Sequence, residues 1–120
     1  MFINFSNHPY SQWSLAQKRA ASEYGEINDI TFPVVPPDAD TDYIQTVSKE
    51  YVDKILGMNP SAVMCQGEFS LAFAVITRLK SCGVSVVAAC SERKVVSNVI
   101  DGATYKNVVF EFIQFREYSS

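Results

Sequence analysis

Three short polar segments carry the side chains best suited to bind or convert a ligand, and each follows an apolar run. In chain order the segments are Ser6, Asn7 and His8; then Gln66, Gly67 and Glu68; then Ser91, Glu92 and Arg93. His8 is the one histidine of the chain, and histidine is the side chain that exchanges protons near neutral pH. An arginine such as Arg93 can clamp a phosphate through two parallel hydrogen bonds.

The segment at Gln66 has two interpretations that the sequence leaves open. Gly67 permits either a tight turn or the close approach of a ligand to the free N–H groups of a following helix. Glu68 either complements the dipole of that helix or acts on the ligand. A carboxylate repels phosphate, so a ligand-directed Glu68 suits a ribose hydroxyl, an exocyclic amine or a proton in transfer.

The other candidates also have structural alternatives. His8 alternatively is a surface histidine in an Asn-His-Pro turn, and Arg93 a solvated charge at the start of an edge strand. Ser91 could donate to a phosphate or cap a backbone group. Trp13 and Phe69 could stack on a base, or belong to the core as most aromatic side chains do.

The pattern of apolar residues predicts the elements that position these segments. Strands are expected at 1–5, 27–32, 62–65 and 84–89; helices at 14–24, from the acidic stretch 38–42 to about residue 56, and at 69–80; and a hairpin of 94–100 with 105–115 around Asp101-Gly102. The first helix opens on a Ser-x-x-Gln capping box. The second has an apolar stripe at Tyr43, Val47, Tyr51 and Ile55, widened by Ile44, Val52 and Leu56. Asp-Gly is a strong hairpin signal.

Alternation of strands and helices predicts an α/β fold over the single domain 1–120. We expect a Rossmann-like three-layer sandwich, with a mostly parallel sheet and a C-terminal antiparallel β-hairpin. Such sheets bind ligands beyond the carboxyl ends of their strands. All three polar segments are expected there, which makes this edge the predicted site.

Composition limits the classes of function. The net charge of −3 argues against binding long nucleic acid, which needs many cationic contacts to phosphate. No apolar run is long enough to span a membrane, and the first residues do not resemble a signal peptide. The three cysteines, Cys65, Cys82 and Cys90, lack metal-site spacing and are expected to be reduced in the cytoplasm. No metal and no cofactor is expected.

The second half of the chain also resembles a known group of proteins. CQGEF before a helix, CSERK after the next strand and the ending FEFIQFREY resemble motifs of small CRISPR-associated proteins of the ring-nuclease type. The resemblance covers about residues 62–118, and the matched positions are Gln66, Gly67, Glu68, Phe69, Ser91, Arg93, Arg116 and Tyr118.

The resemblance implies a homodimer that binds cyclic oligoadenylate, the second messenger of type III CRISPR antiviral defence, across its two-fold axis. It also implies metal-independent cleavage, in which a ribose 2′-hydroxyl attacks the adjacent phosphate. We therefore expect Glu68, Arg93 and His8 to be catalytic, although the resemblance itself gives His8 no role. Ser6, Asn7, Gln66, Gly67, Phe69 and Ser91 are expected to bind the ligand.

Two alternatives remain from the sequence. A protein of the same fold could sense or sequester the nucleotide without cleaving it. A structural subunit could instead pack its hairpin, through Phe110, Phe112 and Phe115, on a partner chain.

Overall fold

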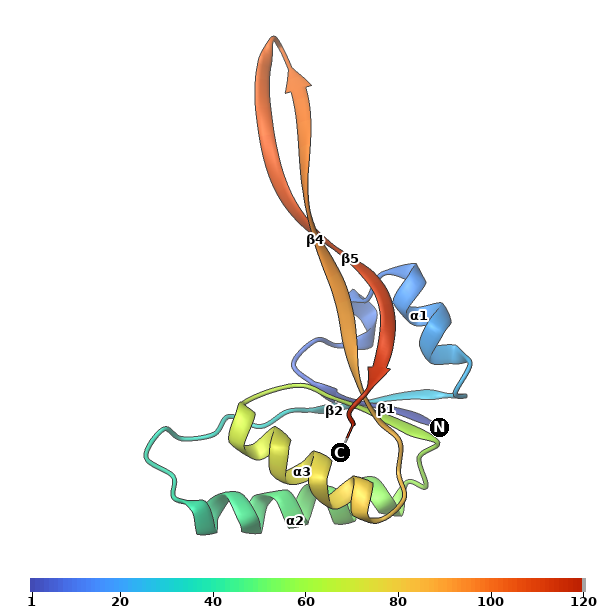
Figure 1. Cartoon of the computed structure of the whole chain (residues 1–120), viewed down its shortest axis with the longest axis vertical. Coiled ribbons are helices and arrows are strands. Elements are labelled where there is room, and N and C mark those ends of the chain that lie inside the picture. Colours follow the sequence, from blue (N-terminus) through green and yellow to red (C-terminus); the bar gives the residue numbers. More distant parts are fainter. Residues whose placement is uncertain (120) are drawn as a thin grey trace.

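Parallel strands and their crossover helices build the N-terminal three-quarters of the chain (Figure 1). The structure is a computed structural model that describes residues 1–119. The strands are β1 (Phe2–Ser6), β2 (Ile27–Thr31), β3 (Ala62–Cys65), β4 (Val86–Ile100) and β5 (Ala103–Glu117), and the helices are α1 (Leu15–Ser22), α2 (Thr41–Gly57) and α3 (Phe69–Ser81), with a 3₁₀ turn at Tyr10–Gln12. The predicted α/β class is confirmed.

The sheet has the strand order β2-β1-β3-β4-β5. β1 to β4 are parallel, and β5 pairs antiparallel with β4. The chain moves to one side of β1 to form β2 and to the other side to form β3. The order therefore reverses between β1 and β3, the place where open α/β sheets bind ligands.

Alternate residues of each strand enter two separate cores, as a pleated strand requires. Ile3, Phe5 and Val63 face α2 and α3, which lie side by side on one face of the sheet. Phe2 and Met64 face the opposite side, where Trp13 and helix α1 cover them. These three layers match the predicted sandwich (Figure 1).

The predicted helix signals are present with small shifts. The Ser14 hydroxyl accepts from the Gln17 N–H and begins α1, and the Asp40 carboxylate accepts from the Tyr43 N–H and begins α2. The buried stripe of α2 runs through Ile44, Ser48, Val52 and Ile55, whereas Tyr43 is exposed. The predicted apolar face is therefore confirmed at Ile44, Val52 and Ile55, and Tyr43 is the one predicted member that is exposed.

The largest difference from prediction lies after residue 89. The sequence predicts a loop at 90–93, but β4 continues through those residues as one strand to Ile100. Asp101 and Gly102, with φ of 51° and 77°, form the two-residue turn to β5, so the predicted hairpin is confirmed. A β-bulge opposite Cys90 and Ser91 leaves Ile113 without a partner in the register.

Candidate functional site

A pocket of about 460 Å³ lies where the strand order reverses. We call it the switch-point pocket. It is lined by His8, Gln12, Trp13, Ser14, Gln17, Met64, Gln66, Ala89, Ser91, Phe110 and Phe112. The lining comes from the loop after β1, the start of α1, the sheet and the hairpin, so four parts of the chain converge on it.

A buried hydrogen-bond network beneath the pocket holds the loop after β1. Asn4, which is 1% exposed, donates from Nδ2 to the backbone oxygen of His8 at 2.8 Å and to Asp29 Oδ1 at 2.9 Å. The Ser6 hydroxyl donates to Asn4 Oδ1 at 2.6 Å and accepts from the His8 N–H at 3.1 Å. The backbone of His8 is thereby held while its side chain is exposed in the pocket lining.

Trp13 completes this support from the side of the 3₁₀ turn. Its Nε1–H donates to the same His8 oxygen at 2.9 Å. The indole is 7% exposed and packs edge-on against Phe2, with ring centroids 6.2 Å apart. Trp13 is thus a core residue, which was one of its two alternatives from the sequence, and the edge of its indole lines the pocket.

Gln66 joins the pocket to the end of the sheet. Its Oε1 accepts from the Ala89 N–H at 2.8 Å, in place of a further backbone bond between β3 and β4. That bond orients the side-chain amide, because only its oxygen can accept. Nε2 is then the group that Gln66 offers to a ligand.

Gly67 packs against the core through its backbone. A Cβ at this position would lie 2.6 Å from the ring atoms of Phe32, which is 2% exposed. The glycine is therefore required by the close approach of Phe32, whatever its part in binding.

Glu68 caps α3 with its own side chain. The two carboxylate oxygens accept from the N–H groups of Ser70 at 3.0 Å and Leu71 at 2.8 Å, and from the Ser70 hydroxyl. The Ser70 hydroxyl and these backbone N–H groups lower the pKa of Glu68 below its ordinary value. The helix N–H groups expected to face a ligand already bind this carboxylate, which lies outside the lining of the pocket.

The remaining predicted residues divide between the hairpin and other surfaces. Ser91 lines the pocket, and Arg93, two residues further along β4, stands opposite Phe110 on the same face of the hairpin. The structure places both on a strand, so the expected loop at 91–93 is wrong. Asn7 is exposed beyond the lining, and Ser6 is buried beneath it.

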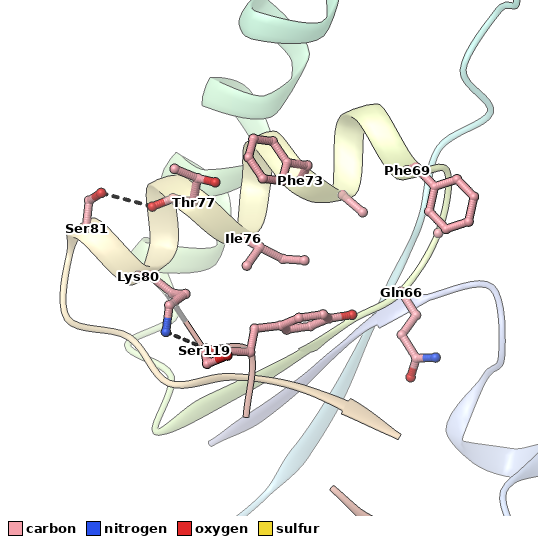
Figure 2. A pocket seen from close by; sticks show the side chains of 11 residues that line it. Gln66, Phe69, Phe73, Ile76, Thr77, Lys80, Ser81 and Ser119 are labelled. Carbon is pink, nitrogen blue, oxygen red and sulfur yellow. Dashed lines mark hydrogen bonds between the residues drawn. The ribbon is translucent and has the colours of Figure 1, made fainter. Parts of the chain in front are cut away.

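A second hollow, of about 1060 Å³, runs along α3 and contains Phe69. Figure 2 shows Phe69, Phe73 and Ile76 along the helix, with the amide of Gln66 turned away from them. Phe69 and Phe73 are 91% and 72% exposed. We call this hollow the α3 groove; it is mostly apolar, and Phe69 is separated by Gln66 from the switch-point pocket.

Cys65, Tyr118 and Arg116 all lie outside the lining of the switch-point pocket. Burial raises the pKa of the Cys65 thiol to about 12, so this thiol stays protonated and unreactive. Tyr118 donates from its hydroxyl to the Cys65 backbone oxygen at 2.8 Å and closes the end of β3. Arg116 lies on β5 opposite Ala88 and is exposed.

Several pocket residues have no sequence signal of a binding site. Ser14 and Gln17 are the predicted capping box, which marks only a helix start, Gln12 precedes them, and Met64 and Ala89 belong to apolar strands. Asn4 could have been recognised, because it is the one polar residue within the apolar run MFINF. Phe110 and Phe112, which the structural-subunit alternative assigns to a partner contact, form one wall of the pocket.

Within the described range 1–119, no three His, Cys, Asp or Glu side chains are grouped to hold a metal ion. No helix of that range is long and apolar enough to cross a membrane.

The chain belongs to the family described as "Uncharacterized protein MJ1673 family", whose model matches residues 1–116. No curated protein and no solved structure matches it.

Proposed function

We propose that this member of the MJ1673 family is a metal-independent ring nuclease of the cytoplasm. It binds cyclic oligoadenylate in the switch-point pocket and cleaves it, which would end type III CRISPR antiviral signalling. The motifs around Gln66, Ser91 and Tyr118 support the choice of this ligand through their resemblance to ring nucleases.

The observation that carries the proposal is the chemistry of the pocket lining. Three side-chain amides, two hydroxyls and an imidazole surround a space walled by Phe110, Phe112 and the edge of Trp13. Amides pair with the hydrogen-bonding edges of a base, and exposed aromatic rings stack on its face. No carboxylate occurs among the lining residues of the described chain to repel a phosphate.

The proposed reaction is an internal transfer within the ligand. The ribose 2′-hydroxyl loses its proton while its oxygen attacks the adjacent phosphorus, and the bond from phosphorus to the 5′-oxygen breaks. The 5′-oxygen takes up a proton, leaving a 2′,3′-cyclic phosphate and a 5′-hydroxyl. The protein must hold the attacking oxygen in line with the leaving oxygen and stabilise the developing charge.

His8 is the proposed proton-transfer residue, because it brings an exposed imidazole into the lining and its backbone is held from below. General acid–base catalysis by one such group is worth roughly 10²–10⁴-fold. Arg93 is the proposed phosphate-binding residue, because it lies outside the lining on the face of the hairpin that continues the pocket. Glu68 is left out of the proposed chemistry since its carboxylate caps α3.

The proposed active form is a homodimer. A cyclic ligand with two-fold symmetry matches a pair of identical pockets, to which each copy contributes its own switch-point edge. One specific observation favours the alternative, a sensor that binds the nucleotide without cleaving it. Among the residues lining the pocket, His8 is the one side chain with an acid–base group suited to neutral pH.

The test is incubation of the purified protein with cyclic tetra-adenylate and cyclic hexa-adenylate, with and without EDTA. We expect linear products ending in a 2′,3′-cyclic phosphate, formed equally in EDTA. Tight binding without products would establish the sensor instead. Absence of both binding and cleavage for both rings would overturn the proposal.

His8→Ala provides the mechanistic test, with Asn7→Ala as the matched control. Both residues are exposed and adjacent, but only His8 lines the pocket. We expect His8→Ala to lower kcat by about 100-fold or more with little change in Kd, while Asn7→Ala leaves both within about 2-fold. Equal turnover by the two variants would remove His8 from the chemistry.

A further inference from the structure

The outer part of the hairpin stands away from the rest of the molecule. Residues 91–113, which we call the arm, form a twisted two-stranded ribbon that extends far beyond the helices (Figure 1). Nearly every residue of the arm is exposed. A two-stranded ribbon is at best marginally stable in water without a further layer on it. Its exposed large apolar side chains are Val95, Val96, Val99, Ile100, Tyr105, Val108, Val109, Phe110 and Ile113.

The two faces of the arm differ in charge. Residues paired across an antiparallel ribbon share a face. One face carries the pairs Ser91–Phe112, Arg93–Phe110, Val95–Val108 and Ser97–Lys106. This pocket face continues the wall of the switch-point pocket and bears two cations, Arg93 and Lys106, which form no salt bridge within residues 1–119.

The opposite face has its charges only at its base. There Lys94 Nζ lies 2.6 Å from Glu111 Oε2 and 3.9 Å from Glu92 Oε2. Beyond this cluster the face is uncharged up to the turn. We call this part the outer face; it consists of Val96, Asn98, Ile100, Tyr105, Asn107 and Val109, with Ala103 opposite Ile100.

We infer that the outer face packs against the outer face of a second copy of this chain. The inference rests on the proposed function only for the pairing of two copies, and it adds a contact on the side of the arm away from the switch-point pocket. In an interface about a two-fold axis, a patch on one copy contacts the same patch on the other copy. A charged patch would therefore contact charges of its own sign. The outer face carries no charge and avoids this repulsion. The pocket face would bring Arg93 and Lys106 near the same cations of the other copy.

The position of the arm also fits a second copy. A partner of opposite charge would be selected by charged side chains, which the outer face lacks. The free half of the arm lies clear of α1, α2 and α3 (Figure 1), so a second ribbon can lie along it without meeting the helices.

The test compares Val96→Lys with Val95→Lys. The two valines are adjacent on β4, 40% and 55% exposed, and on opposite faces of the arm. We expect the wild type to sediment as a dimer at micromolar concentration, and Val96→Lys to weaken the dimer by about 100-fold or more, because symmetry places the lysine in the interface twice. Val95→Lys should remain a dimer, and both variants should keep the wild-type circular dichroism spectrum.

A monomeric wild type would overturn the inference, and so would a dimer that Val95→Lys weakens as much as Val96→Lys. A dimer broken by Phe73→Lys but by neither valine variant would assign the contact to the α3 groove and also overturn it. The proposed function fails separately. Dimerisation through the outer face without any nucleotide binding would retain the inference and refute the nuclease, and cleavage by a monomer would do the reverse.

Discussion

Polar residues follow the apolar runs of both β1 and β3, yet the two segments use their polar groups in opposite ways. After β3, the conspicuous residues serve the fold: Glu68 caps α3, and Gly67 makes room for Phe32. At β1, the buried Asn4 and Ser6 of the strand hold the backbone of His8, and its exposed imidazole stays in the pocket lining.

This difference teaches that hydrogen bonds already made decide which polar side chains remain free to act. Glu68 has a reactive group at the expected edge, but helix donors occupy both of its oxygens. The bonds that hold His8 end on its backbone nitrogen and oxygen. The comparison can be tested by removing each support in turn.

Asn4→Ala should have the largest effect on stability. It deletes the donor to the His8 oxygen and to Asp29 and the acceptor of the Ser6 hydroxyl, in a site that is 1% exposed. We expect a loss of about 2–4 kcal/mol in the free energy of unfolding, because buried partners are left unsatisfied. Urea denaturation measures it. A loss below about 1 kcal/mol, the size expected at an exposed site such as Asn7, would show that the network does not hold the loop.

Gly67→Ala should come next. The new Cβ would meet the buried ring of Phe32 at 2.6 Å, and such overpacking costs about 1–3 kcal/mol. Gly57→Ala is the matched control, since nothing lies within 4 Å of its Cβ position at the end of α2. That control should be neutral or stabilising by up to about 1 kcal/mol. If the two variants were equally stable, the required close approach at Gly67 would be refuted.

Glu68→Gln should have the smallest effect, about 1 kcal/mol at pH 7, as for other helix caps. The lowered pKa of Glu68 means that the carboxylate stabilises the fold above its ordinary value of 4.5, and that this stabilisation is lost as the pH falls through the lowered pKa. The stability of the two proteins should therefore converge in acid. Turnover should stay within about 2-fold, and a loss of 100-fold would return Glu68 to the chemistry.

The sequence was a good guide to the parts of the fold that depend on local signals. Apolar periodicity located β3 and α3 almost to the residue, Ser14 and Asp40 marked helix starts, and Asp101-Gly102 marked the hairpin turn. The edge predicted to bind a ligand contains the switch-point pocket. These features follow from side-chain spacing and backbone preference, which a sequence states directly.

Features that depend on long-range contacts could not be predicted. Ser91 and Arg93 are polar and were expected in a loop, but pairing with β5 extends β4 through them. The approach of Phe32 to Gly67 joins residues far apart in the chain. The walls formed by Gln12, Gln17 and Phe110 depend on how α1 and the hairpin pack, which no local pattern records.

The β-bulge opposite Cys90 and Ser91 determines which side chains of β4 and β5 share a face of the arm. If the register continued from Cys90 and Gln114 without the bulge, Ser91 would face Ile113, and Phe112 and Phe110 would pair with Glu92 and Lys94 on the other side of the ribbon. The bulge thus sets Phe110 and Phe112 on the same face as Ser91 and Arg93, where both rings line the switch-point pocket.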